Sequence, residues 1–171
     1  MEFAIPSQAE IEVMRSIARA GFDYQDSKRL CSAAGWRLVE DEPELGFLQY
    51  QPVFSGKGRL FSVCFRGSPQ CPFAFTALCN FEDYSADRTP FDQAFARVAD
   101  HLKSLLKEPS QIGSYYYSHR PKWSYAFSWW SLDDASLALV QDEYDIQFGM
   151  DVSVWILPAG LDVRIPILAG N

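Results

Sequence analysis

Two histidines and four cysteines are the side chains of this chain best suited to nucleophilic or metal chemistry. His101 lies within an apolar helical pattern, and His119 lies in a polar loop with no fixed partner in sequence. The histidines lack the spacing of a catalytic zinc site, and the cysteines do not form the C-x-x-C pairs of a structural one. Neither a G-x-S-x-G turn nor a phosphate-binding glycine loop occurs. We therefore expect no metal ion, no cofactor and no catalytic residue; the cysteines are Cys31, Cys64, Cys71 and Cys79.

Carboxylates are far more abundant, and six of them lie between Leu132 and Asp151 without a single Lys or Arg. Aspartates in turns usually bond to nearby backbone groups, but this does not explain the missing cations. A negative surface that attracts a basic protein partner does explain them. We interpret the following acids as partner-binding residues: Asp133, Asp134, Asp142, Glu143 and Asp145.

Aromatic side chains are concentrated just before these acids, with eight between residues 115 and 130. Because alternate residues of a strand point to opposite faces, only every second aromatic side chain of a strand can lie on a given face of the sheet. A helix covers the other set, or a partner does. Tyr and Trp are frequent anchors of protein interfaces, so we assign Trp130 and Tyr116 to the partner-binding surface.

The overall charge narrows the class of partner. The formal net charge is -7 and the sequence pI is near 4.8. This composition disfavours nucleic acids and anionic membranes, both of which need clustered Lys and Arg. The sequence shows no signal peptide and no apolar run of roughly 18 residues. We expect a cytoplasmic protein with reduced thiols.

The pattern along the chain predicts a single α+β domain over residues 1–171. Two short helices occupy the first 35 residues, the first with an S-x-x-E capping box at Ser7 and Glu10. A long central helix follows over residues 89–108, with Thr89 as its N-cap. We expect an antiparallel sheet of about six or seven strands on which these helices pack. The expected strands are residues 36–39, 46–53, 60–65, 73–81, 123–130, 135–140 and 146–156, with a possible edge strand at 163–168.

Four segments in this layout resemble small cytoplasmic immunity proteins of bacterial polymorphic toxin systems. They read CSAAGW at residues 31–36, LKEP at 106–109, LVQDEYD at 139–145 and VSVWILP at 152–158. The resemblance spans residues 7–158. It implies a non-catalytic protein that holds a cognate toxin inactive by tight binding. These families share no functional motif, so the resemblance assigns no site residues.

Two alternatives remain open at this point. Secretion chaperones are also small, acidic and α+β, and they would bind an extended effector segment, usually as dimers. A small-ligand-binding domain or an enzyme would instead show an apolar cavity with convergent polar groups. The sequence leaves the choice between monomer and homodimer undetermined.

Overall fold

The first two helices begin at side-chain caps that their own sequences supply. Helix α1 (Gln8–Arg19) starts with a capping box: the Ser7 N–H donates to Glu10 Oε2 at 2.8 Å, and the Glu10 N–H donates to Ser7 Oγ at 3.4 Å. Helix α2 (Tyr24–Ala33) is capped by the Asp23 side chain, which accepts a backbone N–H at 2.9 Å.

The structure, a computed structural model, describes residues 5–53, 60–65, 71–81, 87–117, 123–143 and 149–161.

All the described strands belong to one antiparallel sheet of eight, in the order β1-β2-β3-β4-β8-β7-β6-β5. Consecutive strands pair within β1 to β4 and again within β5 to β8, so the sheet consists of two meanders. The meanders join where β4 pairs with β8, from Ala74 opposite Ile156 to Phe81 opposite Met150. The strands are β1 (Arg37–Glu42), β2 (Phe47–Gln51), β3 (Phe61–Cys64), β4 (Phe73–Phe81), β5 (Gln111–Tyr116), β6 (Ser124–Ser131), β7 (Ser136–Asp142) and β8 (Met150–Leu157).

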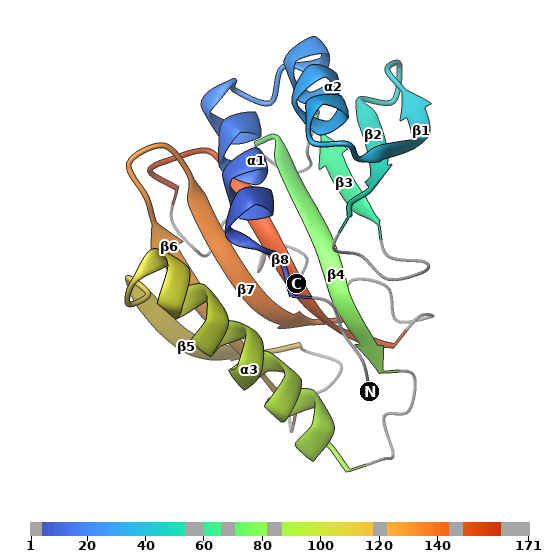
Figure 1. Cartoon of the computed structure of the whole chain (residues 1–171). Helices are drawn as coiled ribbons and strands as arrows, with labels where there is room; N and C mark the ends of the chain where they lie inside the picture. Colours follow the sequence, from blue (N-terminus) through green and yellow to red (C-terminus); the bar gives the residue numbers. More distant parts are fainter. Residues whose placement is uncertain are drawn as a thin grey trace.

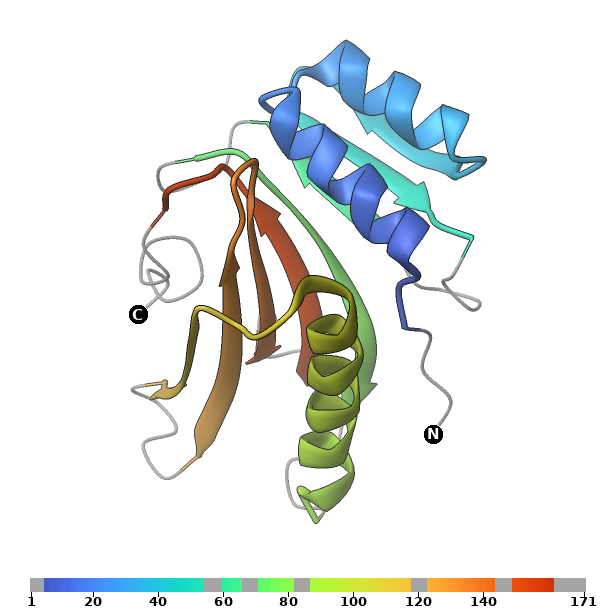
Figure 2. The same cartoon turned by 60° about the vertical axis from the view of Figure 1, so that its left-hand side comes forward.

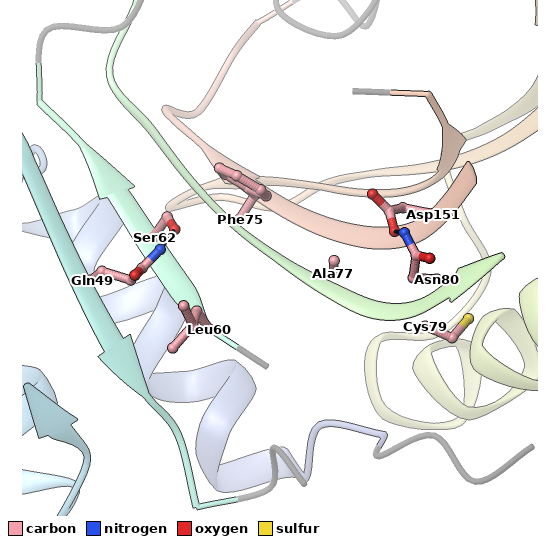
Figure 3. Close-up of a pocket in the computed structure, with 8 residues that line it drawn as sticks. All are labelled: Gln49, Leu60, Ser62, Phe75, Ala77, Cys79, Asn80 and Asp151. Carbon is pink, nitrogen blue, oxygen red and sulfur yellow. Dashed lines mark hydrogen bonds between the residues drawn. The ribbon is translucent and has the colours of Figure 1, made fainter. Parts of the chain in front are cut away.

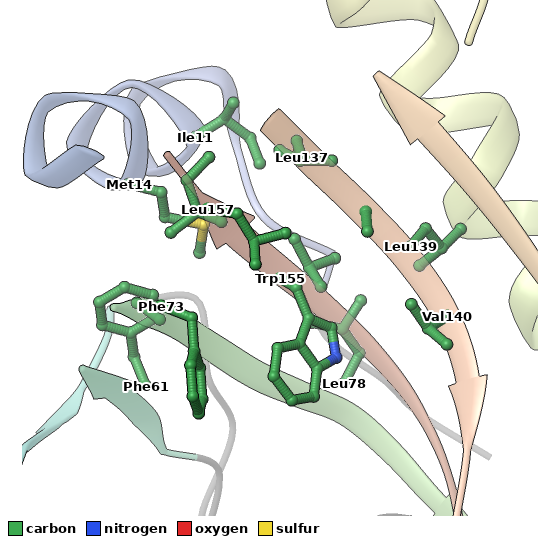
Figure 4. Packing of buried hydrophobic residues seen from close by; sticks show 14 of the residues in the cluster. Ile11, Met14, Phe61, Phe73, Leu78, Leu137, Leu139, Val140, Trp155 and Leu157 are labelled. Carbon is green, nitrogen blue, oxygen red and sulfur yellow. The ribbon is translucent and has the colours of Figure 1, made fainter. Parts of the chain in front are cut away.

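The three described helices pack on the same face of this sheet, as Figures 1 and 2 show. Helices α1 and α2 lie over the first meander, with α1 reaching β8, and α3 (Thr89–Leu106) lies over β6, β7 and β8. Ile11 and Met14 of α1 close the core above β7 and β8 (Figure 4). A row of buried cross-strand partners runs beneath the helices: Val63, Ala74, Ile156 and Leu137.

Helix α3 is held to the sheet by an apolar stripe and by one buried amide. The stripe consists of Phe91, Ala94, Val98 and Leu102. Gln141 of β7 donates to Asp92 Oδ1 at 2.9 Å and accepts the Ala126 N–H at 2.9 Å, so it links α3 to β6. Neither α3 nor any other helix in the described ranges is both long and apolar enough to cross a bilayer.

The α+β class and the antiparallel sheet are confirmed, but the sheet has more strands than expected. Strand β5 was not predicted. The first expected strand, residues 36–39, is too short, because β1 extends through residues 40–42. Arg88 rather than Thr89 is the N-cap of α3, and the Asp87 side chain accepts the Thr89 N–H at 2.9 Å. The expected strand at 163–168, and residues 146–148 of the strand expected at 146–156, lie outside the described residues.

The close packing of β5 on β6 gives a test of the sheet. A Cβ added at Gly113 would lie 2.7 Å from Cε1 and Cζ of Phe127, the residue opposite it on β6. We expect Gly113→Ala to lower the free energy of unfolding by about 1–3 kcal/mol, because the buried ring must move. Urea denaturation measures this. Ser114→Ala, one residue along and exposed, is the control and should change stability by less than about 0.5 kcal/mol. Equal stability of the two variants would contradict the packing.

Candidate functional site

A groove of about 300 Å³ crosses β2, β3, β4 and β8 (Figure 3). Gln49 and Ser62 lie at one end of it and Asn80 and Asp151 at the other, with Phe75 between them. These side chains share a face because Gln49 is opposite Ser62, Ser62 is opposite Phe75, and Asn80 is opposite Asp151 in the register of the sheet. The helices pack on the other face. The groove therefore opens on the side of the sheet that no described helix covers.

Asp151 is the charged side chain of this groove. Its Oδ1 accepts a hydrogen bond from Asn80 Nδ2 at 3.0 Å. On its other side it lies directly opposite Asp142 of β7, so two carboxylates occupy adjacent strands on one face. Burial, and then the charge of Asp142, raise the pKa of Asp151 to about 6. Asp151 therefore changes its charge just below neutral pH.

Asp142 lies deeper than Asp151, and tyrosines surround it. The Tyr117 hydroxyl donates to Asp142 Oδ1, and the Glu143 N–H donates to the same oxygen at 2.7 Å. The Tyr115 ring packs against Tyr117 with 5.6 Å between centroids, and its hydroxyl donates to the Gln141 carbonyl at 2.5 Å. Burial raises the pKa of Asp142, although the bond from Tyr117 opposes the rise. Asp142 is thus a covered carboxyl group next to Asp151.

This arrangement suits binding of a cation better than catalysis. Two neighbouring carboxylates and an aromatic ring attract positive charge. The Phe75 ring is stacked on Trp155 at 4.9 Å between centroids. In the described part of the chain, no three His, Cys, Asp or Glu side chains converge to hold a metal ion.

The acids predicted from the sequence do not form one surface. Asp133 is exposed in the turn before β7, whereas Asp142 ends β7 and Glu143 follows it, and these two are only 3% and 6% exposed. A strand of seven residues separates the two groups by roughly 20–25 Å. Asp145 lies outside the described residues. The expectation of a continuous acidic surface is therefore corrected for the residues that the structure describes.

Asp134 has cationic partners that the sequence pattern did not reveal. Arg15 Nη2 lies 2.9 Å from Asp134 Oδ1, and Arg19 Nη1 lies 2.9 Å from Oδ2. Although burial opposes it, the Arg15 guanidinium holds the pKa of Asp134 below its usual value. The cations missing from residues 132–151 are thus supplied in part by α1. Asp134 ties the β6–β7 turn to that helix.

The two predicted aromatic anchors differ in exposure. Trp130 is 1% exposed, and its indole N–H donates to the Lys107 carbonyl at the end of α3 at 3.0 Å. The helix covers this ring, so Trp130 is a core residue and its expected exposure is wrong. Tyr116 is 55% exposed on β5, and its assignment as an anchor stays a prediction.

Tyr116 belongs to β5, an edge strand that no other described strand or helix covers on its outer side. In the described residues β5 pairs only with β6, and five of its six residues are exposed. Its sequence, QIGSYY, has no charge and no proline, and Ile112 is 71% exposed. The other edge strand, β1, reads RLVEDE and has a bulge between Leu38 and Glu40. Charges and bulges are the usual means of preventing further strand pairing, so only β1 is protected in this way.

The described cysteines and His101 have no convergent catalytic partner among the described residues. The four cysteines form no disulfide, and burial raises the pKa of Cys31 to about 12 and of Cys64 to about 11. Burial also raises the pKa of Cys71, so this thiol is less reactive than a free one. His101 Nε2 lies 2.9 Å from the Pro6 carbonyl oxygen. His119 lies outside the described residues.

The sequence reasoning missed Asn80, Asp151 and Ile112 as candidate functional residues. Asp151 falls on the more polar face of its strand, which is a weak signal. Its partner Asn80 comes from β4, and nothing in the local pattern indicates that β4 and β8 pair. Ile112 is followed by Gly113, which obscures the strand pattern of β5.

The raised pKa of Asp151 predicts a pH-dependent effect on stability. Its folded value of about 6 lies above the usual 3.8, so as pH rises from about 4 to 6 the unfolded chain loses this proton first and stability falls. We expect Asp151→Asn to raise the free energy of unfolding by about 1–2 kcal/mol at pH 7 and by little at pH 4. Urea denaturation at both pH values measures the difference.

The control for this substitution is Asp133→Asn, which also removes one negative charge but at an exposed turn. It should not reproduce the gain at pH 7. A destabilised Asp151→Asn variant at pH 7 would show that the charged form of Asp151 is favourable in the folded protein.

Comparisons with known proteins do not add to these observations. No family model, no curated protein and no solved structure matches the chain. The functional conclusion therefore rests on the edge strand, the groove and their chemistry.

Proposed function

We propose that this chain is a non-catalytic protein that binds another protein by adding a strand of its partner to β5. The observation that carries the proposal is the unprotected edge formed by Gln111–Tyr116, with Ile112 71% exposed and Tyr116 55% exposed. In strand addition, main-chain hydrogen bonds supply affinity and alternate side chains supply specificity. On β5, Ile112 and Tyr116 lie on the same face and are spaced to contact alternate side chains of the partner.

The contrast between the two edges supports this location. Four of the six residues of β1 are charged, and its bulge interrupts a regular ladder. Strand β5 has neither feature, although it is equally terminal in the sheet. An uncharged, regular edge is a hazard for aggregation unless it has a partner. A partner strand would remove this hazard by using the open hydrogen-bonding groups.

The biological role that we propose is neutralisation of a bacterial toxin. The resemblance to immunity proteins implies this partner, and the net charge of -7 would speed capture of a basic toxin. The chain would act by covering the toxin rather than by transforming a substrate, with Tyr116 as an anchor and Asp133 among the acidic groups. We place it in the cytoplasm, where its four thiols, which form no disulfide, would stay reduced.

The same edge also suits the second candidate, a secretion chaperone that holds an extended effector segment. An unfolded segment adds to a sheet edge as readily as a strand of a folded protein does. The two roles differ in the state of the partner. A toxin would remain folded in the complex and lose its activity, whereas an effector would be held unfolded before its secretion.

Two matched substitutions test the edge. Ile112→Lys places a charge on β5, and Leu38→Lys places one on β1, where the wild-type residue is 42% exposed. We expect Ile112→Lys to weaken partner binding more than tenfold, because a charge at the strand junction opposes pairing. Leu38→Lys should leave binding unchanged. Calorimetry with the purified product of a neighbouring toxin gene measures both affinities, and survival of cells that express the toxin measures protection.

Both variants should fold, because each site is exposed, and circular dichroism checks this. Equal binding by Ile112→Lys and wild type would move the interface away from β5. A chain that binds the neighbouring gene product without protecting cells would favour the chaperone role. Self-association of the wild type that Ile112→Lys abolishes would show that a second copy occupies the edge.

A further inference from the structure

We infer that the groove on the helix-free face binds the guanidinium group of an arginine side chain presented by a protein partner. The source of that arginine rests on the proposed function, whereas the chemistry of the groove does not. The groove is also separate from the edge, because it lies across β2, β3, β4 and β8, and β5 is at the far side of the second meander.

The size of the groove limits its occupant to one side chain or a similar small group. Its volume of about 300 Å³ is at the lower limit of ordinary ligand pockets. A helix or a strand would not enter it. A single extended side chain would reach from the rim to the carboxylate of Asp151, past the ring of Phe75 (Figure 3).

The charge of the groove selects a cation. Asp151 lies at one end, and Asp142 lies directly opposite it on the neighbouring strand. None of the described residues that line the groove is Lys or Arg. Asn80 holds Asp151 Oδ1 at 3.0 Å and fixes the orientation of the carboxylate. A bound cation would also reduce the electrostatic repulsion between the two carboxyl groups.

The aromatic and amide groups favour guanidinium over a compact ammonium. Phe75 lines the groove between its polar ends, and its stack on Trp155, at an interplanar angle of 19°, holds the ring in place. A planar guanidinium stacks on such a ring while its N–H groups bond a carboxylate. At the other end, Gln49 Nε2 donates to Ser62 Oγ at 3.3 Å, which positions further polar groups at the rim.

The test uses small probes that do not depend on the partner. The probes are N-acetyl-arginine methylamide, its uncharged citrulline analogue and the corresponding lysine compound. Chemical shifts of the Asn80 side-chain amide and of the Asp151 backbone amide report binding at the groove. We expect the arginine probe to bind at millimolar concentration, the lysine probe several-fold more weakly, and the citrulline probe at least tenfold more weakly.

Two variants and a change of pH complete the experiment. Asp151→Asn should weaken the arginine probe at least tenfold, and Asp100→Asn, at an exposed position of α3, should leave it unchanged. Affinity should fall several-fold between pH 7 and pH 5 as Asp151 takes up a proton. The groups that face Asp151 are Asn80 from β4 and Asp142 from β7, and Asp142 in turn accepts from Tyr117.

Equal binding of arginine and citrulline probes, or no shift at Asn80 and Asp151, would overturn the inference. Tighter binding of free agmatine than of the peptide-like probe would overturn the protein source and indicate a small amine. Failure of the proposed function gives a different result: Ile112→Lys would then leave partner binding intact while the arginine probe still bound. A partner whose affinity falls in Asp151→Asn would link the two sites.

Discussion

The antiparallel pairing of β4 with β8 determines how the rest of this molecule is arranged. Each meander could form locally from neighbouring segments, but these two strands lie far apart in the sequence and join the meanders into one sheet of eight. Their register brings Asn80 opposite Asp151 and continues the apolar row from Ala74 to Ile156 under α1. The pairing also makes β1 and β5 the two outer strands. Both candidate surfaces therefore depend on it.

The two outer strands of the sheet differ in charge and in regularity. Strand β1 has charged residues and a bulge, and Asp41 within it is bonded to Lys28 of α2 at 2.7 Å. Strand β5 is uncharged and regular, and its Gly113 lets the Phe127 ring pack close to the backbone. Inside the sheet, Asp151 is also unfavourable for stability, because burial near Asp142 disfavours its charged form. Features that stability alone does not favour are reasonable places to look for function.

The sequence predicted the parts of the structure that depend on local chemistry. The capping box at Ser7 and the stripe of α3 need only residues a few positions apart, and both formed as expected. Asp142 accepts a hydrogen bond from Tyr117, which is 25 residues away, and the cations that pair with Asp134 come from α1, more than a hundred residues away. Contacts between residues so far apart cannot be inferred from the local sequence pattern. The helix cover of Trp130 was one of the two outcomes that the strand alternation left open, whereas the groove itself was beyond prediction from the sequence.

Backbone hydrogen exchange tests the central claim, that β5 pairs with a strand of the partner, most directly. Amides that point away from β6 should exchange freely in the isolated chain, because in the described structure β5 pairs only with β6. In the complex, the account predicts that exchange slows over Gln111–Tyr116 and stays unchanged in β1. Unchanged exchange in β5, with protection elsewhere on the surface, would contradict strand addition at this edge.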